Sequence, residues 1–197
     1  MVIAVLAVVV AFLMPPGHDP RYAPRIRCAN NLKQIGIVFR AWALEHNDQF
    51  PMQVSVTNGG GREFVLTNNA FLYFQALSNE LVTPKVLWCP TDKTRKPAVS
   101  FKDGFSTSNI SYFVSLDAVV AYPGMFLTGD RNLTNGALLP NRNLELKSNS
   151  VVGWTRELHD GIGNVGLADG SVQSFTTPRI REALIGGGDV TNRLAMP

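Results

Sequence analysis

The sequence predicts an α+β fold in which a long N-terminal helix packs on a small antiparallel β-sheet, accompanied by short helices and a C-terminal hairpin. Helical periodicity occurs near the start of the globular part and near its end, whereas candidate strands cluster between them. The elements show no βαβ alternation, which favours an antiparallel sheet over a parallel one. Hydrophobic residues make up 45% and charged residues 17% of the 197 residues, which is typical of one globular domain.

Residues 1–14 are all apolar. A helix of this length extends about 21 Å, whereas a bilayer core about 30 Å thick needs about 20 residues. Three interpretations are open: the hydrophobic part of a signal peptide, a buried core element, or a membrane anchor that is incomplete, and we favour the anchor. Residues 15–24 follow as a proline-rich connector, and residues 25–197 form the globular domain.

The orientation of such an anchor depends on the charges at its two ends. Arg21, Arg25 and Arg27 lie just beyond the apolar segment. They would place the globular domain in the cytoplasm if Met1 is the true start, because basic residues stay on the cytoplasmic side. A basic leader upstream of Met1 would reverse that orientation.

The first element of the globular domain is a long helix, expected from Ala23 to about Asn47. Asn47, Asp48 and Pro51 end the helical pattern. Apolar side chains recur at spacings of three and four residues, so they form one stripe that faces the core. These side chains are Cys28, Leu32, Ile35, Phe39 and Trp42.

Shorter elements follow the long helix. We expect Asn69 to cap a second helix from Ala70 to about Asn79. β-Branched and aromatic residues then indicate several strands. The expected strands are Val86–Trp88, Ile110–Leu116, Met125–Leu127 and Val151–Trp154.

The C-terminal part predicts a hairpin and a last helix. Asp169-Gly170 lies between two apolar runs over residues 164–175, which indicates a hairpin with a type I′ turn. Thr177-Pro178 opens a helix that continues to about Leu184, and the glycines at 186–188 end it.

Several motifs, taken in order, resemble a known family. Residues 27–51, RCANNLKQIGIVFRAWALEHNDQFP, resemble the first helix of bacterial type IV pilin-like proteins, the pseudopilins, as found in planctomycete-type and verrucomicrobial bacteria. Trp88-Cys89-Pro90-Thr91-Asp92 is similar to the family's Cys-Pro-Ser/Thr-Asp element, and Gly129-Asp130-Arg131-Asn132 also fits. His159, nine further residues and Asp169-Gly170 resemble its C-terminal signature. These motifs span most of the chain.

The resemblance implies a pilin-like fold and a non-enzymatic, membrane-anchored subunit of a type II secretion or type IV pilus-like system. The expected partners are components of that assembly, further copies of the chain, and the inner membrane, with the globular domain in the periplasm. The net charge of +3 argues against a nucleic-acid partner.

The alternative is an unassembled extracytoplasmic binding module that reuses the pilin fold. It is favoured by two departures from the family. The sequence lacks the Gly-Phe-Thr-Leu-Ile-Glu-Leu processing motif, and the prolines between Pro15 and Pro24 would interrupt the continuous helix of a filament subunit.

Cys28 and Cys89 are a candidate disulfide, because the resemblance implies an extracytoplasmic domain, where disulfides persist. The alternative is two buried free thiols, since Cys28 lies on the apolar stripe.

Four residues are candidate metal ligands, and calcium is the ion to consider, because some type II secretion pseudopilins bind calcium in a C-terminal loop. The candidates are Asp130, His159, Asp160 and Asp169. Calcium prefers oxygen ligands, whereas histidine suits zinc. We favour a structural role, in which Asp169-Gly170 forms a turn and His159 braces the hairpin, and we expect no cofactor.

Catalytic motifs are not found in the sequence. It contains no Gly-x-Ser-x-Gly elbow and no P-loop, and the glycines at 161, 163 and 166 run into the expected hairpin instead of opening a helix, as a dinucleotide-binding loop would. Cys28 lies on the apolar stripe and Cys89 precedes Pro90, and neither position is typical of an activated thiol. We therefore expect no catalytic residues and no enzymatic activity.

Overall fold

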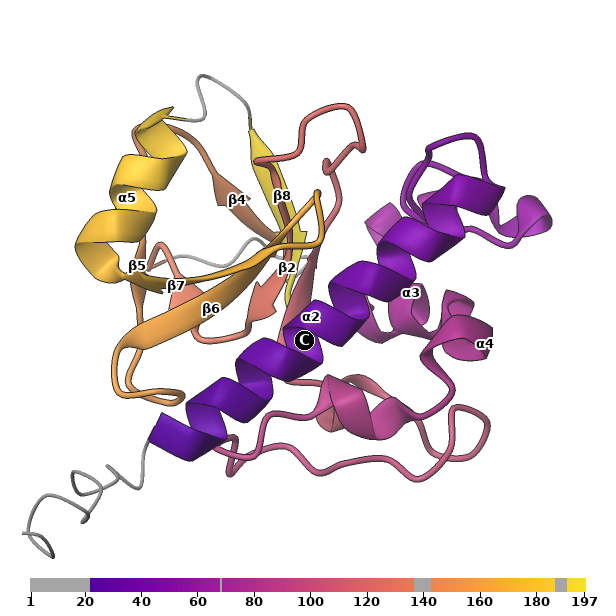
Figure 1. The fold of residues 1–197 in the computed structure, drawn as a ribbon, viewed down its shortest axis with the longest axis horizontal. Coiled ribbons are helices and arrows are strands. Elements are labelled where there is room, and N and C mark those ends of the chain that lie inside the picture. Colours follow the sequence, from indigo (N-terminus) through magenta and orange to yellow (C-terminus); the bar gives the residue numbers. More distant parts are fainter. Residues whose placement is uncertain (1–21, 68, 137–142, 187–190) are drawn as a thin grey trace, which may run out of the picture.

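A computed structural model describes residues 22–67, 69–136, 143–186 and 191–197 (Figure 1). Its α-helices are α2 (Tyr22–Glu45), α3 (Ala70–Ala76), α4 (Ser78–Leu81) and α5 (Thr177–Gly186). Short 3-10 helices cover Val56–Asn58, Arg62–Leu66, Pro84–Leu87 and Thr107–Asn109. The strands are β1 (Tyr112–Ser115), β2 (Phe126–Asp130), β3 (Leu133–Thr134), β4 (Asn143–Leu146), β5 (Gly153–Trp154), β6 (Ile162–Leu167), β7 (Val172–Thr176) and β8 (Asn192–Ala195).

The main sheet has six strands in the order β4-β8-β1-β2-β6-β7, and every neighbouring pair is antiparallel. β3 and β5 pair separately as a two-stranded ribbon. The expected α+β class, with an N-terminal helix and an antiparallel sheet, is therefore confirmed.

Apolar side chains pack on both faces of this sheet. In β1, Tyr112 and Val114 join the cluster under α2, whereas Phe113 between them joins a second cluster with α5. Successive residues of a strand point to opposite faces, so this alternation divides the core into two layers. Figure 1 shows α2, in indigo, crossing the sheet diagonally, with α5, in yellow, beside the far end of the sheet.

The long helix forms as its periodicity predicts, and each residue of the predicted stripe is at most 3% exposed. Pro24 lies in the first turn of the described helix, where its missing N–H costs no intrahelical bond. Residues 22–24 of the expected connector are therefore helical. At the other end, Asn47 and Asp48 take left-handed conformations, which stops the helix.

The predicted anchor, residues 1–14, lies outside the described residues. Within the part of the chain that the structure describes, no helix is both long enough and apolar enough to cross a membrane.

Two predicted elements differ in the structure. The second helix is divided into α3 and α4, because Leu77 departs from helical geometry, and the Asn69 side chain forms no capping hydrogen bond. The predicted strand 86–88 is instead the end of a 3-10 helix. Pro84 opens that helix and the Thr83 side chain accepts a hydrogen bond from the Lys85 N–H, so local capping prevails over β propensity.

The predicted hairpin is confirmed as β6 and β7, but its turn is not type I′. A type I′ turn needs positive φ at two residues, and in the Asp169-Gly170 pair only Gly170 has it, at 82°. The Gly170 N–H donates to Leu167 O at 2.9 Å, and the Leu167 N–H donates to Ser171 O at 2.8 Å. This pattern closes a three-residue loop with a glycine bulge.

Gly129 shows how tightly the centre of the sheet is packed. A Cβ added there would lie 2.6 Å from the Phe113 ring and 2.9 Å from the backbone oxygen of Asn164. Gly124, by contrast, has open space around its Cβ position and no positive φ.

We therefore expect Gly129→Ala to lower the free energy of unfolding by about 1–3 kcal/mol, because the sheet must shift to accept the methyl group. Chemical denaturation followed by circular dichroism measures this change. The matched control, Gly124→Ala, is expected to remain within about 0.5 kcal/mol of the parent. Equal stability of the two variants would contradict the close packing around Gly129.

Candidate functional site

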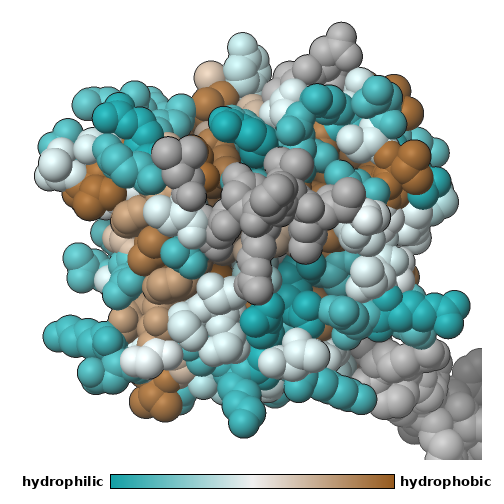
Figure 2. All heavy atoms as spheres, turned by 180° about the vertical axis from the view of Figure 1, so that it is seen from behind, coloured by the Kyte–Doolittle hydropathy of each residue, from teal (hydrophilic) through white to brown (hydrophobic). Residues whose placement is uncertain are grey.

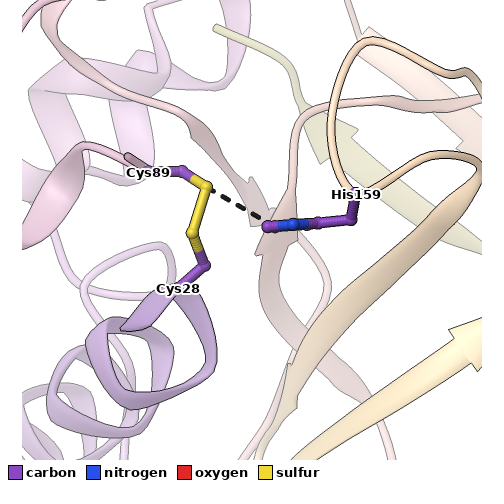
Figure 3. A group of neighbouring side chains, drawn as sticks. All are labelled: Cys28, Cys89 and His159. Carbon is purple, nitrogen blue, oxygen red and sulfur yellow. Dashed lines mark hydrogen bonds between the residues drawn. A yellow bond between two sulfur atoms is a disulfide. The ribbon is translucent and has the colours of Figure 1, made fainter. Parts of the chain in front are cut away.

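A disulfide joins α2 to the segment that follows the 3-10 helix Pro84–Leu87 (Figure 3). Cys28 and Cys89 are both fully buried, and their Cα atoms are 5.2 Å apart. The two residues are separated by 61 positions in the sequence. The sequence left open whether these two cysteines form a disulfide or remain free thiols, and in the structure they are bonded.

The ring of His159 lies against this disulfide, as Figure 3 shows. Its Nε2 is 3.4 Å from Cys89 Sγ and 3.4 Å from Asp130 Oδ2, and its Nδ1 is 3.5 Å from Thr91 Oγ1. The side chain has no solvent exposure. With the proton on Nε2, the ring donates toward Cys89 Sγ and accepts from the Thr91 hydroxyl, with the Asp130 carboxylate close to the same nitrogen.

The backbone at His159 is strained. His159, Asp160 and Gly161 have φ values of 50°, 60° and 84°. Residues other than glycine take this left-handed conformation at a cost of roughly 1–2 kcal/mol each. The buried contacts of the imidazole ring offset that cost and fix the turn that leads into β6.

Asp130, at the end of β2, is completely buried. Its Oδ2 accepts hydrogen bonds from the backbone N–H and the side-chain amide of Asn164, at 2.7 and 2.9 Å. Its Oδ1 has no hydrogen-bond partner among the described residues. Burial, followed by the negative charge of Asp130, raises the pKa of Tyr112 well above 10, so that hydroxyl stays protonated.

A second carboxylate, that of Asp92, is also buried. Asp92 receives two hydrogen bonds from the guanidinium of Arg131, at 2.6 and 2.9 Å, in a bidentate pair. Ser111 Oγ donates to Asp92 and accepts from the backbone N–H of Cys89. Burial opposes ionisation of Asp92, but the hydrogen bonds from Arg131, Thr94 and Ser111 outweigh it, so its pKa lies below the ordinary value.

The motifs singled out in the sequence therefore converge on one cluster. Segment 88–92 supplies Cys89, Thr91 and Asp92. Segment 129–132 supplies Arg131, which pairs with Asp92, and Asp130, which contacts His159. Asn132 extends the cluster, because its side-chain amide donates to Thr155 O and Leu158 O in the segment that carries His159.

The structure divides the four candidate metal ligands. Asp130 and His159 are in contact, whereas Asp160 is exposed. Asp169 lies beyond the opposite end of β6, roughly 20 Å along the strand from His159. The oxygen ligands that calcium requires are thus not gathered among the described residues.

Cys28, Cys89 and His159 lie close enough together to hold a metal ion, with their ligand atoms within 4.8 Å of one another. Zinc, however, binds cysteine as a thiolate. In the disulfide, both sulfur atoms are already bonded, so this group is a structural cross-link with a histidine packed against it.

The turn at Asp169 contacts α2 instead. Asp169 Oδ1 accepts from the Ser171 N–H at 2.7 Å, and hydrogen bonds from Ser171 lower the pKa of Asp169. Lys33 Nζ donates to Gly170 O at 2.9 Å. A Cβ added to Gly36 would lie 3.2 Å from Gly170 Cα, so the turn packs directly on the helix backbone.

The Asp92–Arg131 pair and the role of Asn164 were not predicted from the sequence. The sequence indicated their importance only in that Asp92 lies in the motif 88–92 and Arg131 lies in the motif 129–132. No family model, no curated protein and no solved structure matches this chain. The chemistry of the cluster is therefore judged from its own contacts.

We expect the double variant Cys28→Ala, Cys89→Ala to unfold more easily by about 4 kcal/mol, the chain-entropy value for a loop of this length. Denaturant titration of oxidised protein measures the difference. A thiol assay on the denatured, unreduced parent is expected to find no free thiol. Two reactive thiols in that assay would show that the cysteines are not bonded.

We expect Asp92 to stabilise the fold most above pH 4. Its pKa is lowered in the folded state, so its contribution is present above the unfolded value of about 3.9 and is lost as the pH falls through the lower folded value. Asp92→Asn should lower the free energy of unfolding by about 2–3 kcal/mol at pH 7 and flatten its decline below pH 4.

Urea titrations from pH 7 to pH 2.5 measure this dependence. Asp103→Asn, at an exposed position, is the control and should keep the parent's profile. A profile for Asp92→Asn that runs parallel to the parent's would contradict the role given to the ion pair.

Proposed function

We propose that this chain is a non-enzymatic, membrane-anchored pilin-like subunit, a pseudopilin, of a type II secretion or type IV pilus-like system, with its globular domain outside the inner membrane. One observation carries this proposal. The face of α2 turned away from the core presents a line of apolar side chains. Ile26, Ile37 and Leu44 are 42%, 55% and 73% exposed.

These three residues recur at multiples of about 3.6 positions, so they lie in one row along the helix, opposite the buried stripe. Two charged side chains, Lys33 and Arg40, lie close to the same row. A helix with apolar rows on two opposite sides is suited to packing against the subunit's own sheet on one side and a neighbouring helix on the other.

One other face of the molecule provides a comparison. In Figure 2, which views the molecule from behind, hydrophobic side chains lie among hydrophilic ones. Single exposed apolar residues of that kind need no explanation. The ordered row on α2 therefore favours a specific contact of this helix.

Two further features support the location outside the inner membrane. In the sequence, the apolar residues 1–14 precede α2, which suits an anchor continuous with this end of the domain. Disulfides such as Cys28–Cys89 persist in oxidising compartments and are rare in the cytosol.

The alternative function, an unassembled extracytoplasmic binding module, is favoured by the prolines at positions 15, 16, 20 and 24. Each proline in a helix interior costs about 3 kcal/mol, so these residues oppose one unbroken helix from the apolar segment into α2.

We expect the double variant Ile37→Glu, Leu44→Glu to abolish self-association in the native envelope, because it places two charges in the packing row. A photo-crosslinking amino acid at position 41 should yield adducts with a second copy or an assembly component in the parent, and none in this variant. Val99→Glu, Val151→Glu is the matched control at exposed loop positions and should keep the adducts. Parent protein that remains monomeric and free of adducts would favour the binding module.

A further inference from the structure

An open pocket of about 430 Å³ lies next to the disulfide, between α2 and the segment around Trp88. Arg27, Asn30, Asn31 and Gln34 form its helical wall, at spacings that place them on one side of α2. Lys85 and Trp88 stand on the opposite wall, and prolines close the end. The volume is within the range of sites for small ligands.

The two walls are fixed relative to each other. The Cys28–Cys89 bond joins the residues adjacent to Arg27 and Trp88. The Asn31 amide donates to Trp88 O at 3.0 Å, which ties the walls together a second time. The indole is held by its own N–H, which donates to Arg95 O at 3.1 Å. A ligand would therefore meet two walls and an indole that are already held in place, which reduces the entropic cost of binding.

The charges of the pocket select an anionic ligand. Arg27 and Lys85 have no ion-pair partner within the described ranges, and no acidic residue lines the pocket. Arginine and lysine side chains on facing walls are suited to a carboxylate.

The remaining groups select hydroxyls and one apolar face. The side-chain amides of Asn30 and Gln34 are exposed, and each offers both a donor and an acceptor, as a hydroxyl does. Trp88 is half-buried, so part of its indole is available to an apolar surface. A peptide ligand would more naturally use a strand edge or an apolar groove, neither of which lines this pocket.

We propose that this pocket binds a carboxylate-bearing sugar unit of an acidic polysaccharide. The carboxylate lies between Arg27 and Lys85, the ring hydroxyls bond to the amides of Asn30 and Gln34, and the apolar face of the sugar ring packs on Trp88. This recognition role is separate from assembly through the outer row of α2, so either proposal can fail alone.

The probe for this proposal is tri-galacturonic acid, titrated into the full chain by calorimetry and by tryptophan fluorescence. We expect saturable binding with one site. Trp42 and Trp154 are buried, so the fluorescence change should come from Trp88 and disappear in Trp88→Phe. Neutral galactose oligomers should bind at least tenfold more weakly, because they lack the carboxylate.

Two double charge variants distinguish a specific binding site from general electrostatic attraction to a basic surface. Arg27→Gln, Lys85→Gln is expected to weaken binding about tenfold or more. Arg156→Gln, Arg179→Gln removes the same charge from exposed positions outside the pocket and should leave binding unchanged. Equal weakening in both double variants would overturn the proposal, as would equal binding of polyglutamate or of anionic lipid vesicles. Absence of binding by the folded parent would overturn it as well.

Discussion

The attachment of α2 to the rest of the chain at two points is the constraint on which the structure depends. At Cys28, a disulfide holds the helix to the segment before β1. At Gly36, about 12 Å further along the helix, the turn between β6 and β7 lies against the backbone. With both points fixed, the buried stripe of α2 has one position on the sheet, and every apolar side chain beneath it packs in one register.

The spacing between His159 and Asp169-Gly170 follows from that constraint. The residues between them form β6, an extended strand that places His159 at the disulfide and Gly170 at the middle of α2. Asp130 and Asn164 hold β6 to β2 near its start, so the strand cannot slide by one pair. The contacts of the motif are therefore those of a structural clamp between α2, β2 and β6.

Local sequence patterns predicted the elements that form through interactions between neighbouring residues. The stripe from Cys28 to Trp42 predicts a helix, and Asp169-Gly170 predicts a hairpin, because both patterns lie within a short stretch of sequence. β4 and β8 were missed because each is short and pairs with strands distant in the sequence. The candidate site shows the same difference between local and distant information. The cysteines and His159 can be singled out by residue type. Asp92 and Arg131 resemble solvent-exposed loop charges in the sequence, and only the fold shows that they are buried together.

The same periodicity explains how α2 can serve three surfaces at once. Each residue turns the helix by about 100°, so Cys28, Ile26 and Arg27 point in three different directions. Cys28 points into the core, Ile26 belongs to the exposed apolar row, and Arg27 belongs to the wall of the pocket beside Trp88. A neighbouring helix packed on the row centred on Ile37 would leave the side of α2 that carries Arg27 and Gln34 open. The proposed subunit packing and the proposed ligand binding are thus compatible on one helix, since the disulfide at Cys28 fixes the rotation of that helix about its axis.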